Sequence, residues 1–209
     1  VAYKWLGRIP GGLAVATVVA STVLAAMVGV IGAAVVTMAL VALPSMLRRG
    51  YSPVLAVGTV MAGGTLGILI PPSVLAIVYG LVANQSVGEL YLGSVFPGLV
   101  LSGLYILFSV GYALLNPKAA PRLSPEETPT WSERWRALRS IWSPLVLIFL
   151  VLGTIFLGLA APTEAAAIGA FGAMVVAAIH RRLSWTILRL ALEQTAKATA
   201  MVMWIVFGA

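Results

Sequence analysis

Charged side chains divide the first half of the chain into long apolar segments. No charged residue occurs from position 9 to 47, and two further apolar segments cover 53–83 and 91–115. A helix of about 20 residues crosses the ~30 Å hydrocarbon core of a bilayer. The pattern therefore predicts an all-α polytopic membrane protein.

The second half alternates in the same way. A polar segment at 116–140 is followed by an apolar run at 141–160 and by a helix expected at about 165–180. An amphipathic stretch at 184–197 leads into a final apolar run that begins near Ala198. This last run is too short to span a bilayer, so we expect the sequence to be a segment of a longer protein.

The first apolar run predicts a re-entrant hairpin. As one helix, residues 9–47 would be about twice as long as the hydrocarbon core is thick, yet they fall short of two full crossings. Lys4 and Arg8 precede the run and two arginines follow it, which places both ends in the cytoplasm. Glycines allow a tight turn at a tip over 29–32. Two ordinary short spans are the alternative.

Two adjacent prolines interrupt the segment 53–83. Pro71 and Pro72 have no backbone N–H, so they cannot donate to the carbonyls of Gly67 and Ile68. Inside a membrane, freed carbonyls are tolerated only where protein or a polar cavity receives them. Broken helices of this kind hold substrates and coupling ions in secondary transporters. The prolines therefore predict a broken helix with a functional break.

The distribution of charged residues mainly indicates which loops lie on which side of the membrane. The formal net charge is +7, and positive loops on the cytoplasmic side explain it without nucleic-acid binding. Five basic residues mark the polar segment as cytoplasmic: Lys118, Arg122, Arg134, Arg136 and Arg139. Residues 84–90 carry an acid and no base, so they are expected outside. Three tryptophans are expected in an interfacial belt and part of an amphipathic surface helix: Trp131, Trp135 and Trp142.

Composition also narrows the chemistry. Hydrophobic residues make up 61% of the chain, a fraction that fits no soluble globular class, and cysteine is absent. The single histidine, His180, adjoins two arginines and is expected at the interface. We find no metal-binding His-Glu spacing, no nucleophile with a base and no phosphate loop. The sequence therefore predicts no enzymatic activity.

Residues 63–73, Gly-Gly-Thr-Leu-Gly-Ile-Leu-Ile-Pro-Pro-Ser, resemble the signature of the large membrane subunit of TRAP transporters, the tripartite ATP-independent periplasmic systems (the DctM-like M subunit). Three other stretches fit in order. Residues 10–14 resemble the start of the family's first hairpin, and 49–51 its basic turn. Residues 161–167 resemble its TPTEAAA motif, with Ala161 in place of the first threonine.

The resemblance implies an inverted-repeat elevator transporter in the bacterial inner membrane. Residues 1–83 would form the first-repeat transport core, 84–140 a scaffold helix and cytoplasmic loop, and 141–209 the start of the second repeat. The second hairpin and second broken helix would lie beyond Ala209. The family imports organic acids with sodium, and it works with a small membrane subunit and a periplasmic substrate-binding protein. No cofactor is expected, and sodium would serve as the coupling ion.

The same comparison supplies candidate site residues. Hard cations prefer oxygen ligands, and the hairpin tip lacks hydroxyls, so backbone carbonyls are the main candidates there. Nine residues are expected to form the cation site: Gly29, Val30, Gly32, Gly64, Thr65, Gly67, Ile68, Pro71 and Ser73. Pro72 and Ser73 are candidates for the substrate, because the positive end of the second half-helix favours a carboxylate. The alternative is a structural kink with Ser73 as a helix cap.

Two further features keep a structural alternative. Pro162, Thr163 and Glu164 form a motif of uncertain role; Glu164 serves either gating or subunit contact, or simply complements a helix dipole. A glycine series is expected to allow close helix packing: Gly58, Gly63, Gly64 and Gly67.

Two other functions compete with a TRAP permease. One is a sodium- or proton-coupled carboxylate carrier without a binding protein. The other is a non-transporting membrane scaffold or channel subunit, which the cost of an unwound helix disfavours.

Overall fold

The described part of the chain is all helical. A computed structural model describes residues 9–121 and 131–208, and in these residues it contains no strand. The helices, in chain order, are α2 (Gly12–Val28), α3 (Ile31–Arg48), α4 (Pro53–Leu69), α5 (Val74–Ala83), α6 (Val87–Leu115), α7 (Trp131–Phe156), α8 (Pro162–Ile179) and α9 (Trp185–Gly208). Within these residues, four stretches are long and apolar enough to cross a membrane: Ile31–Arg48, Pro53–Ala83, Val87–Leu115 and Pro162–Ile179. The predicted all-α polytopic class is confirmed.

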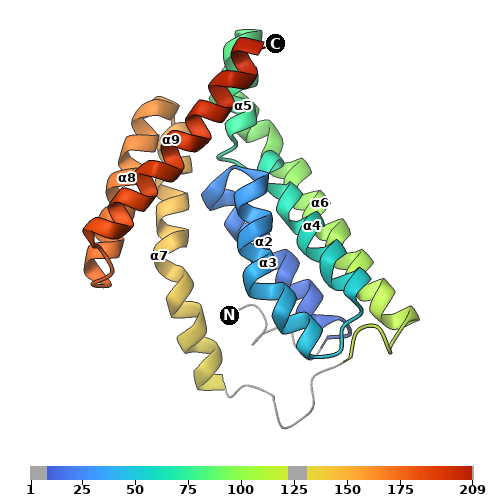
Figure 1. Ribbon diagram of the computed structural model, residues 1–209. Coiled ribbons are helices and arrows are strands. Elements are labelled where there is room, and N and C mark those ends of the chain that lie inside the picture. Colours follow the sequence, from blue (N-terminus) through green and yellow to red (C-terminus); the bar gives the residue numbers. More distant parts are fainter. Residues whose placement is uncertain (1–8, 122–130, 209) are drawn as a thin grey trace.

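Helices α2 and α3 form the predicted hairpin, with both outer ends at the same end of the molecule (Figure 1). The turn is only Gly29 and Val30. Gly29 has a left-handed φ of 64°, and its N–H donates to the carbonyl of Ala25 at 3.2 Å, which ends α2. The predicted tip was too long, since Gly32 already lies in the first turn of α3.

The base of the hairpin is fixed by a Schellman turn after α3. Gly50 has a φ of 77°, and its N–H donates to Leu47, while the N–H of Tyr51 donates to Met46 at 3.1 Å. The turn buries Tyr51, whose hydroxyl accepts the N–H of Leu13 at 3.2 Å. Burial raises the pKa of the Tyr51 hydroxyl above its ordinary value. The two arms are thus tied together at their base.

Helix α4 packs closely against both arms of the hairpin. A methyl group added to Gly63 would lie 2.7 Å from Cβ of Ser21 on α2, and one added to Gly64 would overlap Val35 on α3. Such close approach requires residues without side chains. The expected role of these glycines in packing is confirmed, whereas Gly58 has open space around it and does not take part.

Helix α6 packs against the hairpin and the broken helix together. The Thr22 and Ser102 hydroxyls lie 2.7 Å apart, and those of Thr65 and Tyr105 lie 3.2 Å apart. Each pair links α6 to a different helix, α2 in the first case and α4 in the second. The sequence predicted a scaffold helix over 91–115, and the structure begins this helix at Val87. Its contacts show that it packs directly on the predicted transport core.

Helices α7 and α8 form a second, separate pair (Figure 1). Leu147 of α7 meets Gly172 of α8 so closely that a methyl group there would overlap it. The separate surface helix expected before residue 141 is wrong, because α7 runs without a break from Trp131 to Phe156. Trp142 is exposed, and the side chains of the other two belt tryptophans lie outside the described residues. Helix α9 includes both the amphipathic stretch predicted over 184–197 and the apolar run that begins near Ala198, and none of its residues is buried.

The end of α3 and the turn between α5 and α6 lie at opposite ends of the molecule (Figure 1). Arg49 directly follows α3 and Gln85 lies in that turn, so single cysteines there are expected to be labelled from opposite sides of the membrane. The chain has no cysteine of its own. A membrane-impermeant maleimide should reach Gln85→Cys and Ala161→Cys from the periplasm, and Arg49→Cys and Arg182→Cys only from the cytoplasm. Arg122, also predicted to be cytoplasmic, lies outside the described residues. Labelling of positions 49 and 85 from one side would contradict this topology.

Candidate functional site

The candidate site is the break between α4 and α5. The last hydrogen bond of α4 runs from the N–H of Ile70 to Leu66 at 2.8 Å, and α5 begins at Val74. The two prolines between them carry no N–H, so the carbonyls of Gly67 and Ile68 lack their usual helical donors. The predicted break is confirmed, and two acceptors are left without intrahelical partners.

The hairpin tip lies against this break. The carbonyl of Gly29 accepts the N–H of Val74 at 3.3 Å, and a methyl group on Gly29 would overlap the carbonyl oxygen of Pro72. A methyl group on Gly67 would lie 3.7 Å from the carbonyl oxygen of Val30. The predicted contact between tip and break is therefore confirmed. The tip contacts the middle of the candidate span Pro53–Ala83 and so ends part-way through the membrane. This position favours a re-entrant hairpin over two complete spans.

The two candidate hydroxyls have protein partners. Thr65 donates to the carbonyl of Ala62 at 2.7 Å and faces Tyr105 of α6, not the hairpin tip. Ser73 is fully buried, and its hydroxyl accepts the N–H of Ala76 at 3.4 Å as the N-cap of α5. Ser73 is therefore the N-cap of α5, as the structural alternative expects, and whether it also contacts a cation stays a prediction. The oxygens left to face the tip come from the backbone.

The structure therefore divides the predicted site residues into two groups. Six lie where the tip and the break meet or form the break itself: Gly29, Val30, Gly67, Pro71, Pro72 and Ser73. Ile68 belongs to the last turn of α4 beside them. The other three predicted residues do not line this junction. Gly64 packs on α3, Thr65 faces α6, and Gly32 has no atom within 4 Å of an added methyl group.

Replacing Ser73 with alanine is expected to have a mild effect. The change removes one helix cap, worth about 1 kcal/mol, and leaves every backbone oxygen in place. The sodium concentration for half-maximal uptake should rise by about threefold or less, measured in proteoliposomes with the complete transporter. Ser86→Ala is the matched control, because Ser86 caps α6 in the same way at an exposed position. A complete loss of uptake in Ser73→Ala would contradict this account.

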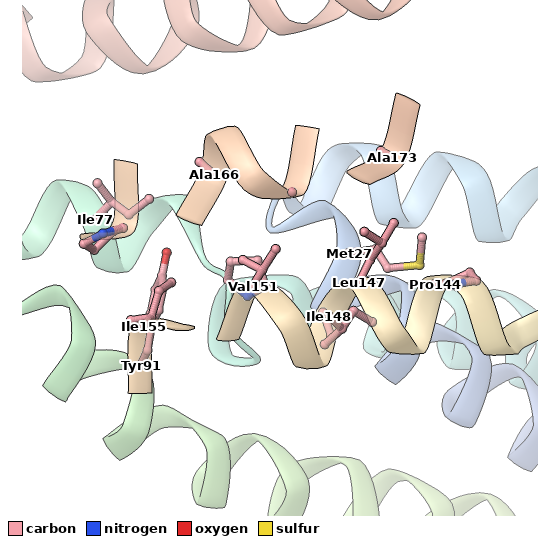
Figure 2. Close-up of a pocket in the computed structure, with 14 residues that line it drawn as sticks. Met27, Ile77, Tyr91, Pro144, Leu147, Ile148, Val151, Ile155, Ala166 and Ala173 are labelled. Atoms are coloured by element: carbon pink, nitrogen blue, oxygen red, sulfur yellow. The ribbon is translucent and has the colours of Figure 1, made fainter. Parts of the chain in front are cut away.

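A cavity of about 300 Å³ adjoins the tip and the break. It lies between Met27 of the hairpin, Pro72 of the break and helices α6 to α8, and no charged residue lines it. Figure 2 shows Tyr91 and Ile155 side by side at one end, and Pro144 toward the other. The cavity therefore separates the hairpin and broken helix from the α7–α8 pair.

The start of α8 explains Glu164. Pro162 opens the helix, and the Glu164 carboxylate accepts the N–H of Ala161 at 2.8 Å. This bond satisfies a free donor at a helix N-terminus, where negative charge is also favoured. The structural alternative for Glu164 is supported by this geometry. The next residue, Ala165, is fully buried beside Tyr91 and Ile155.

The sequence matches the family model described as "Tripartite ATP-independent periplasmic transporter, DctM component" over residues 1–209. The chain belongs to this family. It is 37% identical over 205 residues to the C4-dicarboxylate TRAP transporter large permease protein DctM of Pseudomonas aeruginosa, covering 98% of this chain and 47% of that protein. It therefore spans about half the length of this curated relative. The chain is a multi-pass protein of the bacterial inner membrane.

Two other TRAP permeases show how far the family's substrates vary. The ectoine TRAP transporter large permease protein TeaC of Halomonas elongata is 34% identical over 163 residues, covering 78% of this chain and 37% of that protein. The isethionate TRAP transporter permease protein DctMQ of Oleidesulfovibrio alaskensis is 33% identical over 186 residues, covering 87% of this chain and 28% of that protein. Membership of the family therefore leaves the substrate open.

Sequence reasoning missed the polar contacts of two tyrosines on α6, one of which reaches the break. Tyr105 faces Thr65, and the hydroxyl of Tyr91 donates to the carbonyl of Ser73 at 3.3 Å. A signal was present in the sequence, since a tyrosine within an apolar helix requires a partner for its hydroxyl. The identity of that partner depends on how helices pack and could not be derived from spacing along one helix.

Proposed function

We propose that this TRAP permease segment carries one of the sites at which sodium entry is coupled to the import of an organic acid. The observation that supports the proposal is the junction of the hairpin tip with the proline break. Both elements end there, inside a membrane span, and the two prolines leave the carbonyls of Gly67 and Ile68 without helical donors. A dehydrated cation would replace the missing donors.

The ligands proposed for sodium are backbone oxygens. The carbonyls of Gly67 and Ile68 come from the break. The carbonyl of Val30 comes from the tip; it accepts the N–H of Ala34 at 3.2 Å and would offer its second lone pair. Carbonyl oxygens suit a hard monovalent cation, as they do in other channels and carriers. Because these oxygens belong to two elements, binding of the ion would hold the tip and the break together.

The substrate proposed is a carboxylate. Helix α5 begins at Val74, directly after the break, and its positive end lies beside the proposed cation. A sodium ion and a helix N-terminus together favour an anionic group. The relatives transport C4-dicarboxylates, ectoine and isethionate by name, so the particular acid remains for the assay below to identify.

The partners proposed are a small membrane subunit and a periplasmic binding protein. Fusion of the two membrane components is suggested by the name DctMQ of the isethionate relative. The elevator movement is proposed from the packing, because α2, α3, α4 and α6 form one packed group and α7 and α8 form another. The first group would carry the site past the second.

Uptake by the complete permease in proteoliposomes tests this function. The assay compares candidate carboxylates with and without the small subunit and binding protein, in sodium and in choline. We expect uptake only with sodium and both partners. Uptake without the binding protein would favour an independent carrier, and absence of uptake with every acid, under conditions where the partners assemble, would favour a non-transporting scaffold.

A further inference from the structure

Tyr91 of α6 contacts the residue that directly follows the proline break. It is 1% exposed, and its hydroxyl donates to the carbonyl of Ser73, the residue directly after the prolines. The hairpin tip holds the following residue, since Gly29 accepts the N–H of Val74. The first turn of α5 is thus held from α6 and from the hairpin at successive residues.

The ring of Tyr91 is held in turn by the other helix pair. It forms a buried cluster with Ile155 of α7 and Ala165 of α8, and Figure 2 shows it beside Ile155 at the end of the cavity. Ala165 is 0% exposed, so a larger side chain there would press on this cluster. Few other contacts join the hairpin, broken helix and α6 to the α7–α8 pair.

The start of α8 sets the position of Ala165. Pro162 opens the helix, and the Glu164 carboxylate accepts the N–H of Ala161, which fixes the first turn. Glu164 itself is exposed, whereas the residue that follows it faces Tyr91. Ala165 is therefore the buried residue of this motif, and the cluster that it joins contains Tyr91, whose hydroxyl contacts the residue after the break.

We propose that Tyr91 is a positioning residue for the cation site and that the Ala-Pro-Thr-Glu-Ala-Ala-Ala motif at 161–167 acts through it. The ring of Tyr91 packs against Ala165, and its hydroxyl holds the carbonyl of Ser73 in place. This fixes the start of α5 and hence the direction of the break relative to the hairpin tip. Sodium affinity then depends on whether the α7–α8 pair lies against Tyr91. The inference rests on the proposed sodium site at the break.

Two conservative variants test the proposal in the complete permease, reconstituted with its partners. Tyr91→Phe removes the hydroxyl and keeps the ring, and Ala165→Val adds two methyl groups that press on the buried cluster around Tyr91. Both should raise the sodium concentration for half-maximal uptake by about threefold to tenfold, which matches the loss of one buried hydrogen bond or its geometry. The maximal rate at saturating sodium should stay within about twofold, because the ion ligands remain. The matched control is Tyr79→Phe, at an exposed position on α5.

Thermal melting of each purified variant without sodium separates positioning from stability. A lower melting temperature with an unchanged sodium dependence would show that Tyr91 only packs, and it would overturn the proposal. The Pro71→Ala/Pro72→Ala variant, assayed in parallel, keeps the two ideas distinct. If its sodium dependence is unchanged, the sodium site itself is wrong. If that variant loses sodium dependence while Tyr91→Phe and Ala165→Val behave as wild type, only the positioning role is wrong.

Discussion

Replacing Pro71 and Pro72 together with alanine is expected to abolish sodium-dependent uptake while leaving the protein inserted in the membrane. Alanine restores the N–H groups that the carbonyls of Gly67 and Ile68 lack, so α4 and α5 can join into one helix. A proline inside a helix costs about 3 kcal/mol, and removing each one favours the continuous helix by about a hundredfold. The carbonyls proposed to bind sodium would then accept helical hydrogen bonds instead.

Insertion should survive this change, because a continuous apolar helix satisfies its own backbone in lipid. The measurement is uptake as a function of sodium concentration in proteoliposomes, with protein amount checked by immunoblot. Pro97→Ala is the matched control, since Pro97 lies inside the uninterrupted helix α6. An unchanged sodium dependence in the double variant would mean that the break is only a packing kink.

Gly29→Ala is expected to disable transport from the other side of the same junction. Gly29 has a φ of 64°, which costs a residue with a side chain about 1–2 kcal/mol. The added methyl group would also overlap the carbonyl oxygen of Pro72. The tip must then withdraw from the break, and the half-saturating sodium concentration should rise at least about tenfold or uptake should be lost.

Gly32→Ala offers a control only three residues away. An added methyl group at Gly32 has no atom within 4 Å, and the residue lies in the first turn of α3. Alanine in a helix is favoured over glycine by about 0.5–1 kcal/mol. Wild-type uptake is therefore expected for Gly32→Ala in the same sodium titration. Equal losses in both variants would argue against a specific role for the contact between Gly29 and Pro72.

The main elements were predictable because they follow from local chemistry. A pair of prolines removes two donors wherever it occurs, so the break at Pro71 and Pro72 could be placed from the sequence alone. Basic residues at both ends of an uncharged run that falls just short of two crossings fixed the hairpin. The glycines at 63 and 64 correctly indicated close packing, although the sequence did not distinguish them from Gly58.

The remaining features depend on contacts between helices. The direction in which Thr65 points is set by Tyr105, which lies 40 residues away on α6. The continuity of α7 from Trp131 into the apolar run also escaped prediction, because a change from polar to apolar residues does not by itself end a helix. The contact of Tyr91 with Ser73 is of the same kind, since α5 and α6 must first fold back on each other.

The central claim is that sodium binds where the hairpin tip meets the break. The most direct test is a pair of high-resolution structures of the complete transporter, one in sodium and one in choline. We predict density for an ion in contact with the carbonyl oxygens of Gly67 and Ile68 in sodium, and none there in choline. Maps of equal quality in which those two carbonyls contact no ion in either condition would contradict the account.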